Sequence, residues 1–465
     1  MQVVARDLVH PSPCVESDLG GLRYLRVWRS RGAARGGKSV SARLPRAQRS
    51  RRKGTREVVY RVCAGLDVPK DSLKACLRQP ERRKRSRTLE TFGTTTRELL
   101  RLAAWLTEAQ CTQVAMESRG VYWQPVSHVL EGSFTVLLVN AAHIKQVAGR
   151  KRDVKDCEWI AQLLECGLRK ASFIPPQPLR ELREVTRHRK TLIPERSRIA
   201  NRLQKLVEGA NSKLGSVASD IMGVAARAIL QALVNGERDS HTLAALAQGK
   251  LRAKPEQLEA ALVGTFTAQH AFLLKQLLLP VEFLTARLTE CAQRVEDLCR
   301  PFQQTLEHLQ TLPGVGQRGA EQIVAELGVD MSRLPRPQHA ASWGGLCPGN
   351  PESAGKRKSG KTRTGNRWLR SLLVECAWAA SRTTACYFHT QFRQLTRRRG
   401  AKRAAVAVAH RLLVAAYHII RDGVAYRDVG PDHFDNLHRH RLTSYHIHRL
   451  EELGSHVNLE TTEAA

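Results

Sequence analysis

Along the first half of the chain, short continuous apolar runs alternate with segments in which apolar residues recur at helical spacing. Three short apolar runs have the length and composition of buried strands, at residues 58–66, 112–116 and 134–140. Apolar residues at helical spacing predict helices at residues 95–108, 121–130 and 154–167. A turn around Pro69 predicts a further strand at residues 72–77. Strands that alternate with helices indicate a largely buried sheet covered by helices.

The apolar pattern changes to a helical one over residues 179–311. A 4-3 spacing, typical of a coiled-coil seam, runs through Leu277, Val281, Leu284, Leu288, Cys291, Val295, Leu298, Phe302 and Leu309. Two interpretations stay open at this point. The seam either closes an intramolecular helical hairpin or pairs two protomers as a dimerising arm.

A second candidate seam precedes the first one. It runs through Leu182, Val185, Leu192, Ile199, Leu203 and Leu206, with Arg189 and Arg196 at seam positions. Pro194 and Pro301 fall inside the predicted helices, where proline removes a backbone donor and clashes with the preceding turn. We therefore expect a kink or a break at each proline.

Residues 312–430 have the pattern of a compact, basic helical domain. Helices are predicted at residues 320–327, 366–381 and 401–421, with a glycine-rich loop at residues 343–365. Leu312-Pro313-Gly314-Val315-Gly316 lies between two helices and is similar to a helix-hairpin-helix turn. Backbone N–H groups of Gly314 and Gly316 could hold a DNA phosphate there, and a tight turn without a ligand is the simpler alternative.

Charge adds a partner to this picture. The 465 residues carry a formal net charge of +32, and Lys and Arg gather in runs such as residues 82–85 and 397–399. A basic excess of this size indicates a polyanion, and nucleic acid is the leading candidate. No apolar stretch approaches the roughly 20 residues of a membrane-spanning helix, so we expect no membrane partner.

Cysteine usage points to a reducing compartment. The eleven cysteines are scattered, and none forms a Cys-x-x-Cys pair, so neither a zinc ribbon nor a disulfide framework is expected. A cytoplasmic, nucleoid-associated protein fits these features. Residues 1–57 lack apolar periodicity and are expected to be a disordered basic extension, either a nucleic-acid-binding arm or translated upstream sequence. Residues 431–465 form a basic tail.

Four carboxylates stand at the ends of predicted elements. Asp67 follows the first apolar run, Glu117 follows the second, and Asp153 and Asp156 open a helix three residues apart. Side chains at that spacing project from one face of a helix. The simpler interpretation makes Asp153 a helix cap and Asp156 a first-turn charge favoured by the helix dipole, and for Asp153 taken alone it is the better explanation. The four together indicate a site for Mg²⁺ or Mn²⁺ acting on a phosphodiester.

The glycine-rich loop contains two serines among cations. Ser353 and Ser359 share it with Lys356, Arg357, Lys358, Lys361 and Arg363. A serine hydroxyl could attack phosphorus here, because the cations would stabilise the developing charge. Physical reasoning on the residues does not choose between the two serines, and a plain DNA-binding loop is the simpler interpretation.

Several motifs, taken in their order along the chain, carry a family resemblance. They are Gly65-Leu66-Asp67-Val68-Pro69-Lys70-Asp71, Met116-Glu117-Ser118-Arg119-Gly120, Gly149-Arg150-Lys151-Arg152-Asp153-Val154-Lys155-Asp156, Leu312-Pro313-Gly314-Val315-Gly316 and the segment from Gly345 to Lys356. Together they resemble the DEDD-type transposases of bacterial insertion sequences. The resemblance runs from about Val58 into the tail.

The resemblance implies a fold, a site and partners. The fold would be α/β plus all-α: a RuvC/RNase H-like mixed sheet with helices, a long helical coiled-coil arm, and a helical C-terminal domain with a helix-hairpin-helix-like turn. The metal-binding tetrad would be Asp67, Glu117, Asp153 and Asp156, and Ser353 would form a covalent link to DNA. A structured guide RNA and a homo-oligomer, dimer or tetramer, would complete the assembly.

The sequence therefore predicts a DNA transposase or site-specific recombinase of an insertion sequence. Its expected segments are residues 1–57, 58–178 with the acidic residues, 179–311 as the arm, 312–430 with the serine, and 431–465. Two alternatives remain: a RuvC-like structure-specific endonuclease without a serine step, and an inactive nucleic-acid-binding remnant of a transposase. A covalent protein–DNA intermediate would separate the first function from the others.

Overall fold

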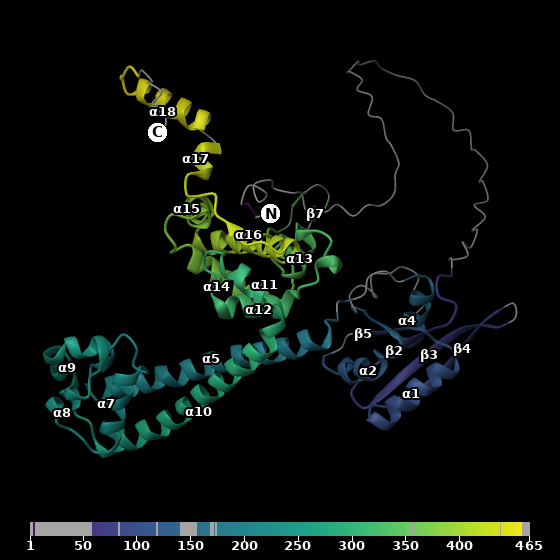
Figure 1. The fold of residues 1–465 in the computed structure, drawn as a ribbon, viewed down its shortest axis with the longest axis horizontal. Coiled ribbons are helices and arrows are strands. Elements are labelled where there is room, and N and C mark those ends of the chain that lie inside the picture. Colours follow the sequence, from purple (N-terminus) through teal and green to yellow (C-terminus); the bar gives the residue numbers. More distant parts are fainter. Residues whose placement is uncertain are drawn as a thin grey trace, which may run out of the picture. The chain divides into compact units, whose positions relative to one another are not determined.

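The computed structural model describes eleven stretches of the chain: residues 3–4, 58–81, 84–117, 120–139, 156–167, 172, 174–350, 352–353, 356–357, 359–437 and 439–457. The chain divides into two compact units (Figure 1). The sheet unit comprises residues 21–174, and the helical unit comprises residues 1–20 and 175–465. Each unit has hydrophobic cores of its own.

A five-stranded mixed sheet forms the centre of the sheet unit (Figure 1). Its strands, in spatial order, are β4 (Lys84–Gly93), β3 (Ser72–Glu81), β2 (Cys63–Asp67), β5 (Gln113–Glu117) and β6 (Thr135–Val139). β3 is antiparallel to β2 and β4, whereas β2, β5 and β6 run parallel to one another. The predicted mixed sheet with helices is confirmed.

Helices cover both faces of this sheet. α1 (Thr96–Glu108) and α2 (Trp123–Leu130) share a core with one face, through side chains such as Leu102 and Leu130. α4 (Asp156–Glu165) lies on the opposite face, where Trp159 and Leu164 pack against Cys63 and Ala115. Successive strand residues point to opposite faces, and both faces are covered, so β2 is buried from Cys63 to Leu66 and half-buried at Asp67.

Two long helices form the arm of the helical unit. α5 (Gln177–Gly209) and α10 (Ala268–Cys299) lie side by side (Figure 1). The short elements between them, which pack around a separate small core, are α6 (Leu214–Val217), α7 (Val224–Val234), α8 (Ser240–Ala245), η2 (Gly249–Ala253) and α9 (Pro255–Leu262). Val281, Leu284 and Val295 of the predicted seam are buried within this single chain. The seam therefore closes an intramolecular hairpin.

The prolines behave differently from one another. α5 continues from Gln177 to Gly209 with Pro194 inside it, so a break at this position is wrong and the alternative, a kink, stays a prediction. α5 packs against α10 and α12, and this packing maintains the helix although proline cannot donate a backbone hydrogen bond at this position. Pro301 does coincide with a boundary, because α10 ends at Cys299 and the short turn η3 (Arg300–Phe302) follows.

The remainder of the helical unit packs around one large core. Its elements are α11 (Gln303–Gln310), α12 (Gln317–Leu327), η4 (Met331–Arg333), α13 (Pro337–Trp343), α14 (Arg367–Ala380), α15 (Tyr387–Arg399) and α16 (Ala401–Asp422). Leu179 and Leu182 of α5 join the same core. β9 (Tyr426–Arg427) pairs in parallel with β1 (Val3–Val4), and α17 (His433–Leu437) and α18 (Arg439–Glu452) follow.

α16 corrects one expectation from the sequence. Among the described residues it is the one helix that is long and apolar enough to cross a membrane by length and composition, although no such stretch was expected. The reason for its apolar character lies in the fold. Val408, Leu412 and Tyr417 are fully buried in the core, with α13, α14 and α15 packed around the helix.

Candidate active site

Asp67 and Glu117 lie at the same edge of the sheet. They are the last residues of β2 and β5, two neighbouring parallel strands in which Leu66 pairs with Met116. The register places the next residue of each strand, Asp67 and Glu117, beside one another. Glu117 is only 5% exposed, although it is a carboxylate. Parallel strands explain this proximity, because their carboxyl ends meet at one edge.

Gly65 brings the third carboxylate to this edge. A Cβ atom at Gly65 would lie 2.3 Å from the carbonyl oxygen of Cys157 and 2.4 Å from the backbone nitrogen of Ala161. The absence of a side chain thus lets the first turns of α4 lie directly on β2. Asp156 is the first residue of α4 and lies in this same part of the helix. The predictions from sequence gave Gly65 no role, although a glycine inside a strand is a signal of close backbone approach.

Electrostatic coupling supports the nearness of α4 and the end of β2. Burial raises the pKa of the Cys157 thiol, and the negative charges of Asp67 and Glu158 raise it further. Cys157 directly follows Asp156 in the chain. The carboxylate at the end of β2 is therefore close enough to act on a side chain in the first turn of α4.

Two other carboxylates of α4 form ion pairs with the sheet. Glu158 accepts a hydrogen bond from Arg87 of β4 at 2.7 Å, and Glu165 accepts one from Arg78 of β3 at 2.7 Å. Both glutamates are buried. These ion pairs hold α4 against the antiparallel half of the sheet and leave Asp156 at the parallel half. They distinguish structural carboxylates from the predicted metal-binding ones.

Three of the four predicted acidic residues can be placed. Asp67 and Glu117 end neighbouring strands at the carboxyl edge of β2 and β5, Asp156 begins α4, which packs on β2, and Asp153 lies outside the described residues. Within the described parts of the chain, no group of three or more His, Cys, Asp or Glu side chains has the geometry of a metal site. The donor chemistry nevertheless fits the expected cation, since Mg²⁺ and Mn²⁺ prefer carboxylate oxygens.

The predicted phosphate-binding turn joins α11 to α12. Gly314 has φ +81°, and a Cβ atom there would lie 2.4 Å from the carbonyl oxygen of Cys376 in α14. Gly314 thus serves close packing against α14. Gly316 is exposed at the start of α12, an added Cβ atom there would have no atom within 4 Å, and Arg318 follows it on the surface. Of the two glycines, Gly316 is the one whose backbone a phosphate could reach.

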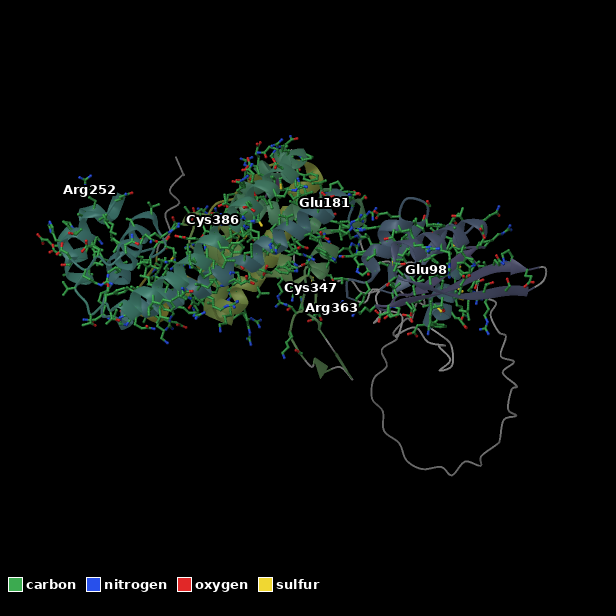
Figure 2. All side chains as sticks on the ribbon, turned by 90° about the horizontal axis from the view of Figure 1, so that it is seen from below. Glu98, Glu181, Arg252, Cys347, Arg363 and Cys386 are labelled. Carbon is green, nitrogen blue, oxygen red and sulfur yellow. The ribbon has the colours of Figure 1, made fainter. Side chains whose placement is uncertain are left out.

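The serine loop, residues 344–365 between α13 and α14, has a paired base. The Asn366 N–H donates to the Trp343 carbonyl at 2.9 Å, and the Arg363 N–H donates to the Cys347 carbonyl at 3.1 Å. A Cβ atom on Gly365 would lie 2.3 Å from the nitrogen of Gly345, so only glycine allows the two ends to cross. Figure 2 shows Cys347 and Arg363 where the loop leaves the helices.

Further along, the loop forms a short hairpin. In β7 (Glu352–Ser353) and β8 (Lys356–Arg357), Ser353 pairs with Lys356, so the serine adjoins the tip. Ser359 is placed differently. Its hydroxyl accepts a hydrogen bond from the Lys361 N–H at 3.1 Å and so stabilises a local turn.

The predicted cations of the loop divide into three groups. Lys361 and Arg363 are exposed at its base. Lys356 and Arg357 form the returning strand of the hairpin. Lys358 lies outside the described residues.

Two family models match the two halves of this picture. A family model of DEDD transposases of the IS110 group, described as "Transposase", matches residues 64–211. A second, described as "Transposase IS116/IS110/IS902 family", matches residues 306–393. None of the curated proteins matches the chain. Among solved structures, one titled "Thermus thermophilus RuvC structure" is 20% identical, covers 25% of this chain and 85% of its own, and has a TM-score of 0.17.

The two matches define the class of protein. One contains the acidic edge of the sheet and the other contains the turn and the serine loop, so the chain is a transposase, an enzyme that cuts and rejoins DNA. It belongs to the IS110 family of insertion-sequence transposases. The predicted family and enzyme class are thereby confirmed.

Proposed function

We propose that this transposase moves its insertion sequence as a site-specific recombinase with two chemical centres. Asp67, Glu117, Asp153 and Asp156 bind Mg²⁺ or Mn²⁺, and Ser353 is the nucleophile. One observation carries the proposal: Asp67 and Glu117 end adjacent parallel strands, and α4 brings Asp156 to the same side of the sheet across Gly65. Asp153 precedes α4 by three residues in the sequence and completes the set.

The acidic residues suit a phosphodiester substrate only with cations present. Carboxylates that converge without counter-charge repel one another and would repel DNA. Bound divalent cations would supply positive charge that stabilises the charge developing on the phosphodiester. The protein's part is to hold the carboxylates in place, through the β2–β5 register and through the pairs that fix α4 to β3 and β4.

The serine step is an exchange of one ester for another. The Ser353 oxygen bonds to phosphorus as the bond from phosphorus to a deoxyribose oxygen breaks, and the departing oxygen gains a proton while the serine loses one. Bond energy is conserved, so rejoining needs no ATP. Ser353 is favoured over Ser359 because it adjoins the hairpin tip, whereas the Ser359 hydroxyl is engaged in a turn at the loop's base.

DNA is held by the basic surface around these groups. Backbone N–H groups at Gly316 and the side chains of the loop cations Lys356, Arg357, Lys358, Lys361 and Arg363 contact phosphates. A net charge of +32 suits a large nucleic-acid assembly. We further propose that a structured guide RNA from the element pairs with donor and target DNA, and that the protein acts as a homo-oligomer.

The acidic centre is tested with Asp67→Asn and Asp156→Asn proteins. Each should lose strand exchange on DNA that carries the element's ends and should bind Mn²⁺ more weakly in calorimetry, while its melting temperature changes little. Asp71→Asn is the matched control, because Asp71 is exposed in the turn after β2 and outside the set. Full strand exchange in EDTA, or in both variants, would contradict the proposal.

The serine is tested on denaturing gels. Ser353→Ala protein should bind DNA without forming a covalent adduct, and Ser359→Ala protein should still form one. The reverse pattern would assign the nucleophile to Ser359. Metal-dependent cutting with no adduct in wild-type protein would favour a RuvC-like endonuclease without a serine step.

A further inference from the structure

α12 is a buried helix that carries polar side chains. All its residues from Gly319 to Leu327 are buried, including Glu321, Gln322 and Glu326. Glu326 is fully inaccessible to solvent. A buried carboxylate is costly unless charged and hydrogen-bonding partners surround it. The partners of Glu326 therefore show what this position is built to hold.

Glu326 joins α5 to the start of α14. Arg187 of α5 donates to it with two nitrogens, Nε to Oε1 at 2.7 Å and Nη2 to Oε2 at 2.8 Å. Asn366 donates to Oε2 through its side-chain amide at 2.6 Å. Arg183, one turn before Arg187, donates to the backbone carbonyls of Ala325 and Glu326 at 3.0 and 2.7 Å. Every strong contact of this carboxylate leads to α5 or to Asn366.

Asn366 is the residue where the serine loop ends. Its N–H donates to the Trp343 carbonyl and closes the base of the loop, and its Oδ1 accepts from the N–H groups of Trp368 and Leu369 and caps α14. Trp343, at the other end of the loop, lies under the guanidinium of Arg183 at 6.0 Å. Both ends of the serine loop are thus tied to arginines of α5.

We infer that Glu326, Arg187 and Asn366 form a positioning network that fixes the base of the serine loop relative to α5. The inference rests on the proposed nucleophile Ser353. These residues do not touch DNA; they act through the loop they anchor. α5 is also the first helix after the sheet unit along the chain, so the network links the loop to the helix that leads from the acidic site.

The network predicts a specific defect when the link is cut. A nucleophile must be held close to its in-line position, and a displacement of about 1 Å can cost on the order of 100-fold in rate. Loss of the Asn366–Glu326 bond should therefore slow adduct formation at saturating DNA by about tenfold or more. DNA affinity should stay unchanged, because the cations of the loop remain.

Asn366→Ser is the decisive variant. Serine keeps the helix cap at the start of α14 and the backbone bond to Trp343, and it removes only the amide that reaches Glu326. Gln322→Met is the matched control, since Gln322 is also buried on α12 but its side chain donates to the Trp368 carbonyl of α14 and not to Glu326 or Asn366. Glu326→Gln is a second variant. It removes the negative charge that pairs with Arg183 and Arg187, and it is interpreted only if its melting curve shows a folded protein.

Two measurements distinguish a failure of the positioning network from a failure of Ser353 as the nucleophile. Adduct rate and DNA affinity are measured for wild type, Ser353→Ala and each variant. Limited trypsin digestion measures cleavage after the loop cations, independently of serine chemistry. Asn366→Ser should give slower adduct formation and faster loop cleavage than Gln322→Met. Equal cleavage and equal adduct rates in the two proteins would overturn the inference. If wild type forms no adduct, the proposed nucleophile fails, and the cleavage comparison alone decides.

Discussion

At the residue scale, the proposed acidic site depends on a glycine as much as on its carboxylates. Gly65 is buried in β2 under the backbone of Cys157 and Ala161. The carboxylates could be suggested from their residue type alone. The contact that brings α4 onto β2 is between backbone atoms and involves no reactive side chain.

Gly65→Ala should therefore damage the fold and the site together. A Cβ atom 2.3 Å from a backbone oxygen cannot be accommodated by a side-chain rotation. We expect a loss of about 1–3 kcal/mol in unfolding free energy, typical of overpacking, with loss of strand exchange. Thermal melting and a strand-exchange assay measure both effects.

Gly132→Ala provides the control for this substitution. Gly132 lies in the same unit, after α2, with no atom within 4 Å of an added Cβ. It should melt like wild type and remain active. A Gly65→Ala protein with wild-type stability would show that α4 does not rest on β2 as described.

At the scale of elements, the arm shows how one pattern can serve two structures. A 4-3 apolar seam predicts helix pairing but does not name the partner. Here α5 and α10 of one chain provide both helices. Arg189, which looked out of place on the second seam, pairs with Glu321 of α12 at 2.7 Å, so that position faces the C-terminal core and not the hairpin seam.

Leu284→Asp should destabilise the arm. The number of protomers in the assembly should not change. Leu284 is 8% exposed in the hairpin, so a carboxylate there loses its hydration and lowers the unfolding free energy by roughly 3 kcal/mol or more. Phe283→Asp is the matched control on the other face of the helix, where Phe283 is 61% exposed.

Two measurements distinguish the two faces of α10. Circular dichroism melting should show a loss for Leu284→Asp and little change for Phe283→Asp. Light scattering should give the same mass for Leu284→Asp as for wild type wherever the protein is folded. A lower mass in folded Leu284→Asp protein would show that the seam also pairs two protomers.

At the scale of the whole molecule, the proposed chemistry is divided between two units of the chain. The acidic residues lie in the sheet unit and the serine lies in the helical unit. Strongly basic segments accompany both, as expected for an enzyme whose substrate is a polyanion. Residues 1–57 contribute charge, and their composition predicts no core of their own.

Deletion of residues 1–57 should leave both units folded. Of this segment the structure describes Val3 and Val4, whose pairing with Tyr426 and Arg427 adds a few backbone hydrogen bonds worth about 1 kcal/mol each. The truncated protein should keep its melting temperature within a few degrees and retain strand exchange. Loss of exchange at low salt in a folded truncated protein would identify the segment as a nucleic-acid-binding arm.

The sequence by itself determined the class of each unit and the chemistry of the residues. Continuous apolar runs revealed β2, β5 and β6, because strands buried on both faces are apolar throughout. Helical spacing revealed α1 and the long helices, because an apolar face repeats about every 3.6 residues in a helix. β4 was missed, because its first half is a run of cations with no apolar alternation, and Arg87 finds its partner only on α4. α15 was missed because its last turn is Arg397-Arg398-Arg399.

Tertiary structure decided which of these elements meet. β2 and β5 are neighbours although β3, β4 and α1 separate them in the chain, and this pairing brings Asp67 beside Glu117. The partners of Glu326 lie on α5 and at the start of α14, far from it in sequence. A local pattern specifies which face of an element is buried. The choice of what covers that face depends on packing between distant segments, which no local pattern contains.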